Sequence, residues 1–503
     1  MRFTIFSFLF IVSFLCAKAQ PKERVKVAGF FTGQIKDYDP STKDSLMVAY
    51  YPDQSLNTSD EPQFFIHPDE NGEFKFEIPP VSHPIRILFG LFTSKPIFIN
   101  DYLMEPGDKI HMEIRYNEGQ IKVKYTGNGA SKYAAKDLIS IENDLCYERV
   151  GAYESSLQLT TSVTANFDSL QVEKHLAVYN ILNESLIRVN KILDQIRNKR
   201  SKSMYRLIKA DQLSFYGSNW LLQSRFFLNN CKSNKLKKKI IDRYNQFKSE
   251  LYFKNAPINA YSLNVINLNL QEARFDLYLE NELKPYSYTR LYQRIKTSYT
   301  GRYRERMLLH FFNDPANFQF ITNYSQVEFG DCLTDALSYF KDPPIIALIR
   351  RKLLLKKGAL AYDFTMPDQN GQLHNLHDFR GSVVLVDVWG EGCTACTHFS
   401  SVFKKEVYPH LKDLENFKVI SISIDRKKEV WQKGINSGRY TQQTFTNLYT
   451  AGIGVEHPFL EYYNVKSIPF LLLVDKYGRI YTEFQASMKS SQILSIIHRA
   501  LSE

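Results

Sequence analysis

Residues 383–396 read VVLVDVWGEGCTAC, and this stretch decides the fold of the C-terminal part of the chain. Residues 383–389 are apolar apart from Asp387, as expected of a β-strand that is buried on both faces. We expect a helix to begin at the two cysteines that follow, Cys393 and Cys396. From there to the end of the chain, strand patterns alternate with helical patterns, which predicts an α/β sheet with helices on both faces.

The other elements of this sheet can be placed around the first strand. Asn370-Gly371 is a strong signal for a β-hairpin. The expected strands are 417–424, 470–474 and 479–484, and the expected helices are 428–435 and 491–501. Together they predict one α/β domain over residues 358–503.

Cys393 and Cys396 are the candidate catalytic residues. Two cysteines three positions apart can close a small disulfide ring, and the first stands where the helix dipole and unpaired backbone N–H groups favour a thiolate. The thiolate is the form that attacks disulfides. We therefore expect Cys393 to attack the disulfide of a partner protein, and Cys396, one turn further on, to attack Cys393 and release the product.

Asp387 is the candidate proton acceptor for this exchange. It shares a strand face with Leu385 and Trp389, because the side chains of a strand alternate between its two faces. A carboxyl group on a buried face is costly unless it has a partner or a catalytic role, and burial raises its pKa toward the range of a useful base. The alternative is a structural Asp that binds nearby backbone groups.

Pro469 stands just before the strand expected at 470–474. Proline is tolerated at the start of a strand. A cis bond between Ile468 and Pro469 would form a tight bend whose backbone can pair with a substrate in β fashion, whereas a trans bond would only mark the edge of the strand. We expect Ile468 and Trp389 to contact the substrate.

These segments resemble the thioredoxin superfamily, in particular the exported TlpA/ResA-like thiol–disulfide oxidoreductases. The resemblance spans residues 360–503 and rests on 362–364, 370–371, 384–389, 393–396, 468–469 and 474–478. It implies that Cys393 is the nucleophile, that Cys396 resolves the mixed disulfide, that Asp387 relays protons and that Pro469 is cis beside the disulfide. It further implies a reductant or isomerase that receives electrons from a membrane partner, with the cysteine pair as its redox group and no separate cofactor or metal.

The sequence departs from the family pattern in three ways. Gly392 stands where thioredoxins usually have an aromatic residue, so we expect a barer surface beside the nucleophile. Thr394-Ala395 lacks the proline that is common between the two cysteines. The separation of Cys396 and Pro469 exceeds that of a minimal thioredoxin, which is typical of the helix–strand insertion in the TlpA-like group.

The regions before the α/β domain show two other patterns. Short strands separated by turns predict an antiparallel β-sandwich over residues 20–128, and residues 105–108 and 125–129 resemble the domain often placed before such modules. Apolar residues at helical spacing predict a helical domain or linker over residues 129–357. The expected strands are 25–31, 46–51, 74–78, 85–89, 97–104, 110–114 and 121–125, and the expected helices are 133–145, 170–196, 204–228, 237–253 and 345–355.

Residues 1–19 have the pattern of a signal peptide. Arg2 is followed by an apolar run at 5–15 and by Ala17-Lys18-Ala19, which suits a signal peptidase. The 11 residues of that run are too few to span the roughly 30 Å of a bilayer core as a helix. A lipoprotein signal at Cys16 is disfavoured because Leu15 is not small. We expect cleavage near Ala19 and a soluble periplasmic or otherwise extracytoplasmic protein.

Charge and the remaining cysteines add less. The formal net charge is +11, but the basic residues are scattered, so nucleic acid is not expected as a partner, whereas peripheral contact with a membrane stays open. Cys146, Cys231 and Cys332 lie far apart in the sequence, and we expect them to be buried free thiols.

Two other functions remain as alternatives. A peroxiredoxin-like peroxidase needs a Pro and a Thr upstream of its reactive cysteine, and Val386 and Gly390 stand at those positions instead. A binding or structural envelope protein with a vestigial thioredoxin module would not need the intact cysteine pair.

Overall fold

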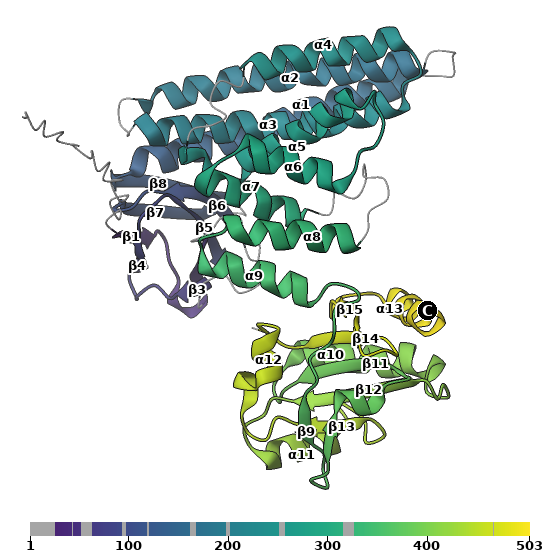
Figure 1. Cartoon of the computed structure of the whole chain (residues 1–503). Helices are drawn as coiled ribbons and strands as arrows, with labels where there is room; N and C mark the ends of the chain where they lie inside the picture. The colour runs from purple at the N-terminus through teal and green to yellow at the C-terminus, as the bar shows by residue number, and fades with distance from the viewer. Residues whose placement is uncertain are drawn as a thin grey trace, which may run out of the picture. The chain divides into compact units, whose positions relative to one another are not determined.

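The computed structural model describes residues 26–42, 44–51, 63–92, 97–117, 120–160, 167–197, 202–250, 257–314, 326–465 and 467–503 (Figure 1). The expected signal peptide, residues 1–19, lies outside the described residues. Internal contacts group the chain into two compact units. One holds the N-terminal strands, the first part of the first helix, the end of the second and the first residues of the third. The other holds the rest of these helices, the helices that follow and the C-terminal α/β region.

The N-terminal strands form two four-stranded sheets, in the orders β4-β1-β7-β8 and β3-β2-β5-β6. All seven expected strands are present, and the short β3 was missed. The strands are β1 (Val27–Ile35), β2 (Ser45–Tyr51), β3 (Gln63–Ile66), β4 (Glu73–Val81), β5 (Ile85–Phe92), β6 (Ile97–Met104), β7 (Lys109–Asn117) and β8 (Gln120–Asn128).

The pairing of β1 with β7 corrects the expected antiparallel arrangement. These two strands run parallel, with Phe31 opposite Ile110, whereas every other recorded pair of these sheets is antiparallel. A parallel pair needs a long crossover connection, and here the chain forms five other strands between its two members. Alternate side chains of both sheets are buried in one apolar cluster that Tyr133 joins from the first helix.

A buried ion pair fixes that helix on the strands of its own unit. Lys132 lies two residues into α1 (Ala130–Thr160), and its Nζ donates to both carboxylate oxygens of Asp108, the residue before β7. Both side chains are 2% exposed. The hydroxyl of Tyr133 also donates to Asp108, at 3.1 Å. The two charges are thus buried away from water, where either charge would be strongly destabilising without the other.

The middle of the chain is helical, as expected. The helices after α1 are α2 (Phe167–Asp194), α3 (Lys202–Asn230), α4 (Asn234–Glu250), α5 (Leu263–Glu280), α6 (Tyr288–Ser298), α7 (Gly301–Asn313), α8 (Gln326–Ala336) and α9 (Pro343–Leu354). Helices α5 to α8 were not anticipated. In α5 this is because buried polar residues such as Gln271 and Arg274 interrupt the amphipathic pattern. The capping serines Ser262 and Ser287, which accept N–H groups from the first turns of α5 and α6, were available signals.

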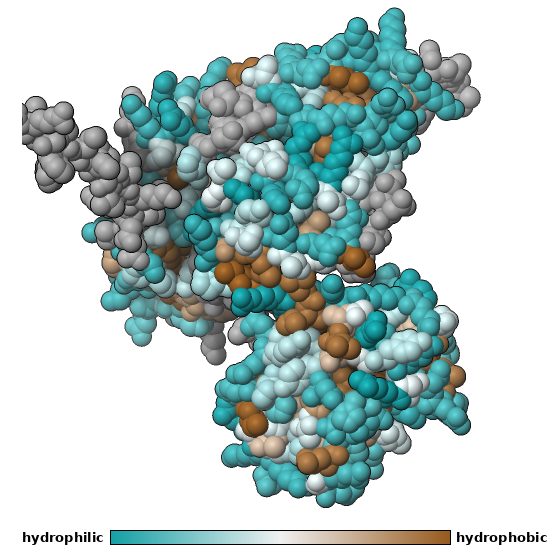
Figure 2. Space-filling view, in the orientation of Figure 1, coloured by the Kyte–Doolittle hydropathy of each residue, from teal (hydrophilic) through white to brown (hydrophobic). Residues whose placement is uncertain are grey.

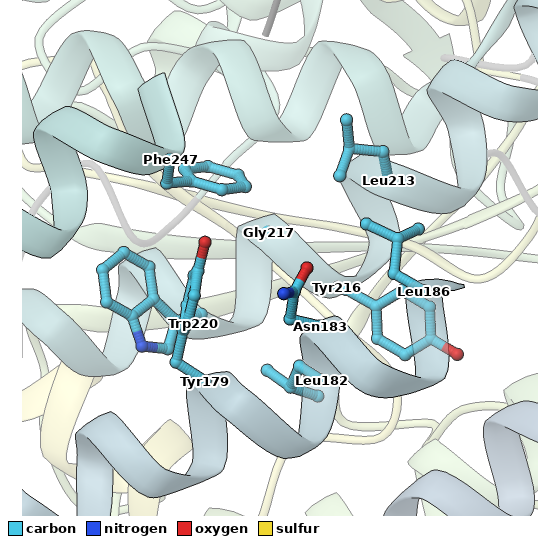
Figure 3. A pocket seen from close by; sticks show the side chains of 9 residues that line it. All are labelled: Tyr179, Leu182, Asn183, Leu186, Leu213, Tyr216, Gly217, Trp220 and Phe247. Carbon is cyan, nitrogen blue, oxygen red and sulfur yellow. The ribbon is translucent and has the colours of Figure 1, made fainter. Parts of the chain in front are cut away.

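A small cavity lies between α2, α3 and α4 (Figure 3). Its volume is about 20 Å³, which has room for roughly one water molecule. Its walls are almost entirely apolar and aromatic, and they include the rings of Trp220 and Phe247, whose centroids are 6.0 Å apart. Cys146, Cys231 and Cys332 are buried free thiols, as expected.

The C-terminal α/β region is built on a five-stranded sheet in the order β13-β12-β11-β14-β15. Its three parallel strands are β13 (Thr446–Tyr449), β12 (Phe417–Ser423) and β11 (Val383–Trp389), and its two antiparallel strands are β14 (Phe470–Val474) and β15 (Ile480–Phe484). The helices are α10 (Thr394–Val402), α11 (Lys428–Ser437), α12 (Pro458–Tyr462) and α13 (Ser490–Ser502). A hairpin of β9 (Thr365–Pro367) and β10 (Leu373–Asn375) precedes the sheet, with Asn370-Gly371 in its turn. The expected α/β fold is therefore confirmed, and β13 is an element that the sequence did not reveal.

None of the described helices has the length and apolar character needed to cross a bilayer. The face drawn in Figure 2 is mainly hydrophilic and carries apolar residues in patches.

Candidate active site

Strand β11 carries Asp387 and Trp389 on the same face of the sheet. All seven of its residues are buried, as the apolar run predicts. Asp387 lies opposite Ser421 of the parallel neighbour β12 and opposite Leu471 of the antiparallel neighbour β14. The strand therefore brings a carboxyl group into the centre of the sheet, six residues before Cys393.

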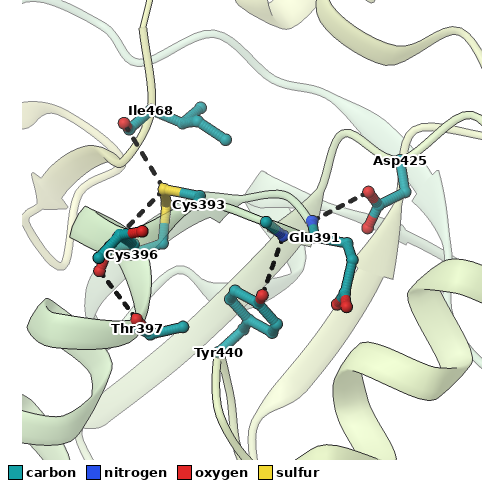
Figure 4. Close-up of a disulfide and its surroundings, with 9 residues drawn as sticks. Glu391, Cys393, Cys396, Thr397, Asp425, Tyr440 and Ile468 are labelled. Atoms are coloured by element: carbon teal, nitrogen blue, oxygen red, sulfur yellow. Dashed lines mark hydrogen bonds between the residues drawn. A yellow bond between two sulfur atoms is a disulfide. The ribbon is translucent and has the colours of Figure 1, made fainter. Parts of the chain in front are cut away.

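The two cysteines lie at the start of α10 and are joined by a disulfide (Figure 4). Cys393 is the residue that caps the helix, and its Sγ accepts the backbone N–H of Cys396 at 3.1 Å. Cys393 is partly exposed, whereas Cys396 is 2% exposed. A partner can therefore reach the first sulfur, which also accepts the N–H of Cys396 and lies at the positive end of the helix dipole.

The segment before β14 lies beside the disulfide. The carbonyl oxygen of Ile468 is 3.7 Å from Sγ of Cys393, and the Ile468–Pro469 peptide bond is cis. Ile468 and Pro469 are both partly exposed. The backbone at Ile468 thus lies next to Sγ of Cys393, the sulfur that a partner protein can reach.

Asp387 is buried, and one of its two carboxyl oxygens makes no recorded hydrogen bond within the described part of the chain. Its exposed fraction is 7%, and Oδ1 has no hydrogen-bond partner among the described residues. Burial raises the pKa of Asp387 to about 7, and the charge of Lys404 opposes this rise in part. The Nζ of Lys404 itself donates to the carbonyl of Gly438 at the end of α11. A carboxyl group with this pKa can both accept and return a proton near neutral pH.

Trp389 lies beneath the site. Its side chain is completely buried, its indole N–H donates to Oγ of Ser421 at 2.7 Å, and its ring stacks on Tyr440. Because a side chain without exposed surface cannot touch a docked partner, we correct the expected substrate contact of Trp389 to a supporting role. The indole packs in an apolar cluster that also contains Cys396 and Trp431.

Sequence reasoning missed two side chains that hold the loop before Cys393. Asp425, two residues after β12, accepts the backbone N–H of Glu391 at 3.0 Å. Tyr440, in the segment between α11 and β13, accepts the backbone N–H of Gly392 at 2.9 Å. No local motif marks either residue, although an Asp that follows a buried strand was an available signal for Asp425.

The backbone conformation favours glycine rather than an aromatic residue at position 392. The φ of Gly392 is +86°, in the region that favours glycine. A Cβ built on it meets nothing within 4 Å, so space does not exclude a side chain. The backbone itself therefore disfavours an aromatic residue here.

Among the described residues, no group of three or more His, Cys, Asp or Glu is placed to hold a metal ion. The described site combines the cysteine pair at the start of α10 with the buried carboxyl group of Asp387 on the strand that leads to it.

Comparison with known proteins agrees with this geometry. A family model described as thioredoxin-like matches residues 381–480. The thiol-disulfide oxidoreductase ResA of Geobacillus kaustophilus is 25% identical over 142 residues, which are 28% of this chain and 76% of ResA. The ResA of Geobacillus thermodenitrificans is 24% identical over the same length.

Solved structures show similar coverage. The thioredoxin domain of a thiol-disulfide oxidoreductase from Bacteroides vulgatus is 27% identical and aligns with 29% of this chain and 97% of its own, with a TM-score of 0.26. A thiol:disulfide interchange protein from Bacteroides sp. is also 27% identical, and it aligns with 30% of this chain and 92% of its own at a TM-score of 0.26. The matching family model and the ResA relatives identify the C-terminal region as a thioredoxin-like domain of the TlpA/ResA-like kind, similar to the thiol–disulfide oxidoreductases that carry it.

Proposed function

We propose that the chain exchanges disulfides with protein substrates through Cys393 and Cys396. The observation that carries this proposal is the difference between the two sulfurs. Cys393 is partly exposed at the helix start and accepts an N–H, while its disulfide partner Cys396 is buried behind it. Such a pair has one sulfur that a partner can reach and a second that acts only within the protein.

In the reducing direction, the thiolate of Cys393 attacks one sulfur of a substrate disulfide. A mixed disulfide forms, and the other substrate sulfur leaves as a thiolate that takes up a proton. Cys396 then gives its proton to the carboxylate of Asp387 and attacks Sγ of Cys393. The second substrate thiolate is released, two electrons have passed to the substrate, and the cysteine pair is left as the disulfide seen here.

The backbone at Ile468 is proposed to guide the substrate. Its carbonyl lies 3.7 Å from Sγ of Cys393 and next to partly exposed Pro469, where an extended peptide can form β-type hydrogen bonds. Asp387 is proposed as the proton relay, since burial places its pKa at about 7.

We propose that this reaction takes place outside the cytoplasm, in keeping with the signal pattern at residues 1–19. Return of the disulfide to the dithiol then needs electrons from a membrane partner, and the protein acts as a reductant or isomerase. Peripheral contact with the membrane is part of this proposal, and nucleic acid is not.

We propose domain boundaries near residues 128 and 357, with residues 20–128 forming a β-sandwich. In support, β8 ends at Asn128, α1 begins at Ala130, and α9 ends at Leu354 ahead of the α/β region. The buried side chains of both N-terminal sheets also share one cluster. Limited proteolysis that cut within strands rather than near these boundaries would contradict the division.

A trapping experiment tests the exchange. Cys396→Ser in the full chain keeps the nucleophile but cannot resolve, so a mixed disulfide at Cys393 should accumulate in the cell envelope and be identified by mass spectrometry. Cys393→Ser with Cys396→Ser is the matched control and should trap nothing. The proposal fails if the single variant traps no more protein than the double variant, or if the purified wild type does not cycle between dithiol and disulfide.

A further inference from the structure

The loop that leads from β11 to the nucleophile is held from outside the cysteine motif (Figure 4). The backbone N–H of Glu391 donates to Oδ1 of Asp425 at 3.0 Å, and that of Gly392 donates to the hydroxyl of Tyr440 at 2.9 Å. Both acceptors come from residues 425–440, the segment after β12 that contains α11. Two successive N–H groups before Cys393 are therefore bound by side chains more than 30 positions away in sequence.

Tyr440 itself is held by several contacts. It is 2% exposed, and its ring lies flat on Trp389, with centroids 4.9 Å apart and planes 6° apart. Trp389 is fixed in turn by its hydrogen bond to Ser421. Gly434 of α11 allows the helix to approach, since a Cβ there would lie 2.5 Å from the indole of Trp389. The hydroxyl of Tyr440 thus has little freedom to move away from Gly392.

Asp425 is also fixed. Its Oδ2 accepts the hydroxyl of Ser423 at 2.7 Å, and its backbone N–H donates to the same hydroxyl oxygen at 3.1 Å. Ser423 is the last residue of β12 and is completely buried. The sheet therefore determines where both acceptors stand.

The position of the loop matters because it sets the place of one sulfur. Gly392 has a φ of +86°, and the next residue is Cys393, whose Sγ lies 3.1 Å from the N–H nitrogen of Cys396. Stabilisation of an anion by a helix start falls off within the first turn. A small displacement of Cys393 would weaken the hydrogen bond from the N–H of Cys396 to its Sγ. This bond stabilises a thiolate more than a neutral thiol, because hydrogen bonds to charged acceptors are stronger.

We propose that Tyr440 is a positioning residue for the nucleophile: its hydroxyl, together with the carboxylate of Asp425, holds the 390–393 loop so that Sγ of Cys393 stays against the start of α10. The inference rests on the proposed function and adds that residues 425–440 control the stability of the Cys393 thiolate. The recorded hydrogen bonds of Tyr440 and Asp425 in this loop go to backbone N–H groups, and neither residue has a recorded hydrogen bond to Sγ of Cys393 or Cys396.

Tyr440→Phe is the direct test, because it removes the hydroxyl and keeps the stacked ring. Tyr449→Phe is the matched control: Tyr449 belongs to the same aromatic cluster and stacks on Trp431 with centroids 4.9 Å apart, but its hydroxyl has no recorded bond to the 390–393 loop. The full chain is reduced, and its reaction with iodoacetamide is followed against pH. Peptide mass spectrometry assigns the alkylation to Cys393 rather than to the buried thiols.

Tyr440→Phe should move the midpoint of the pH profile upward and slow alkylation at neutral pH by about two- to tenfold, the size expected for one hydrogen bond. At equilibrium with glutathione, the variant should contain less dithiol, since a less stable thiolate favours the disulfide. Tyr449→Phe should match the wild type in both measurements.

Asp425 provides a second route to the same answer. Asp425→Ala removes the acceptor for the N–H of Glu391 and should move the pH profile of alkylation in the same direction as Tyr440→Phe. Asp425→Asn keeps an oxygen there, so its profile should stay close to that of the wild type. The inference is overturned if Tyr440→Phe folds and matches Tyr449→Phe, or if it does not fold and Asp425→Ala matches Asp425→Asn. A wild type that does not cycle at all contradicts the proposed function instead.

Discussion

The rings of Trp389 and Tyr440 are stacked with their centroids 4.9 Å apart and their planes 6° apart. One ring comes from the strand that carries Asp387, and the other comes from the segment between α11 and β13. This contact joins the strand of Asp387 to the loop that precedes Cys393, and Gly434 of α11 packs against the indole of Trp389. Packing changes behind the stack should therefore affect both stability and redox behaviour.

Gly434→Ala tests that packing. A Cβ at this position would lie 2.5 Å from the indole of Trp389, so the substitution overpacks a buried site. Alanine is intrinsically better than glycine in a helix by about 1 kcal/mol, but overpacking costs roughly 1–3 kcal/mol. We expect a net loss of about 1 kcal/mol in the free energy of unfolding, measured by urea denaturation with tryptophan fluorescence.

Gly151→Ala is the matched control for that change. Gly151 lies in α1, and a Cβ there meets nothing within 4 Å, so the variant should be as stable as the wild type or more stable. Equal effects of the two substitutions would show that Gly434 is not in close contact with Trp389.

Asp387→Asn should change how stability depends on pH. Burial raises the pKa of Asp387 to about 7 in the folded chain, above the value of about 3.9 for an exposed Asp. Between these values the folded state binds more protons than the unfolded state, so the carboxyl group lowers stability as the pH rises toward 7.

Asn does not titrate, so this decline should disappear in the variant. Relative to Asp387→Asn, the wild type should lose on the order of 2 kcal/mol more between pH 5 and pH 8, as measured by urea denaturation at both values. Asp413→Asn, at an exposed position of the same domain, is the control and should keep the slope of the wild type. Parallel curves for wild type and Asp387→Asn would contradict a raised pKa at this site.

The same variant should slow the resolving step. Removal of the carboxylate takes away the proposed base for Cys396, and general base catalysis is typically worth 10²–10⁴-fold. We expect product release from a preformed mixed disulfide at Cys393 to become at least about tenfold slower. In stopped-flow measurements the wild-type rate should rise through about pH 7, and this rise should be absent from the variant. An unchanged profile would assign Asp387 a structural role.

Gly392→Ala tests the backbone before the nucleophile. At a φ of +86° an L-residue is strained, which costs roughly 1–2 kcal/mol even though the Cβ meets no neighbour. The variant should be less stable by about that amount in urea denaturation. Ala395→Gly, at an exposed position in the first turn of α10, is a control that should cost no more than about 1 kcal/mol. A Gly392→Ala protein as stable as the wild type would exclude the left-handed conformation.

Lys132→Met tests the buried ion pair of the N-terminal unit. It leaves the carboxylate of Asp108 buried without its cation, which should cost about 3–5 kcal/mol of unfolding free energy. Lys136→Met on the same helix breaks a pair with Asp101 whose side chains are 24% and 25% exposed, and it should cost about 1 kcal/mol or less. Circular dichroism of urea-treated protein measures both, and similar losses would indicate that the Asp108 pair is solvated.

The sequence by itself determined the C-terminal fold and the place of its cysteine pair. A buried strand needs a continuous apolar run, a helix start needs a cap, and both patterns are local, so 383–389 and Cys393–Cys396 were recognisable without coordinates. The seven expected N-terminal strands were recognisable for the same reason, since alternation is a property of neighbouring residues.

Only the tertiary structure decided which distant residues meet. The parallel pairing of β1 with β7 depends on a crossover through five other strands. The sequence predicts that Trp389 contacts the substrate, but in the fold its ring is enclosed by Tyr440, Ser421 and Gly434. The hydroxyl that binds Gly392 lies 48 positions further along the chain. Contacts of this kind depend on strand register and helix approach, and no local pattern of residues encodes them.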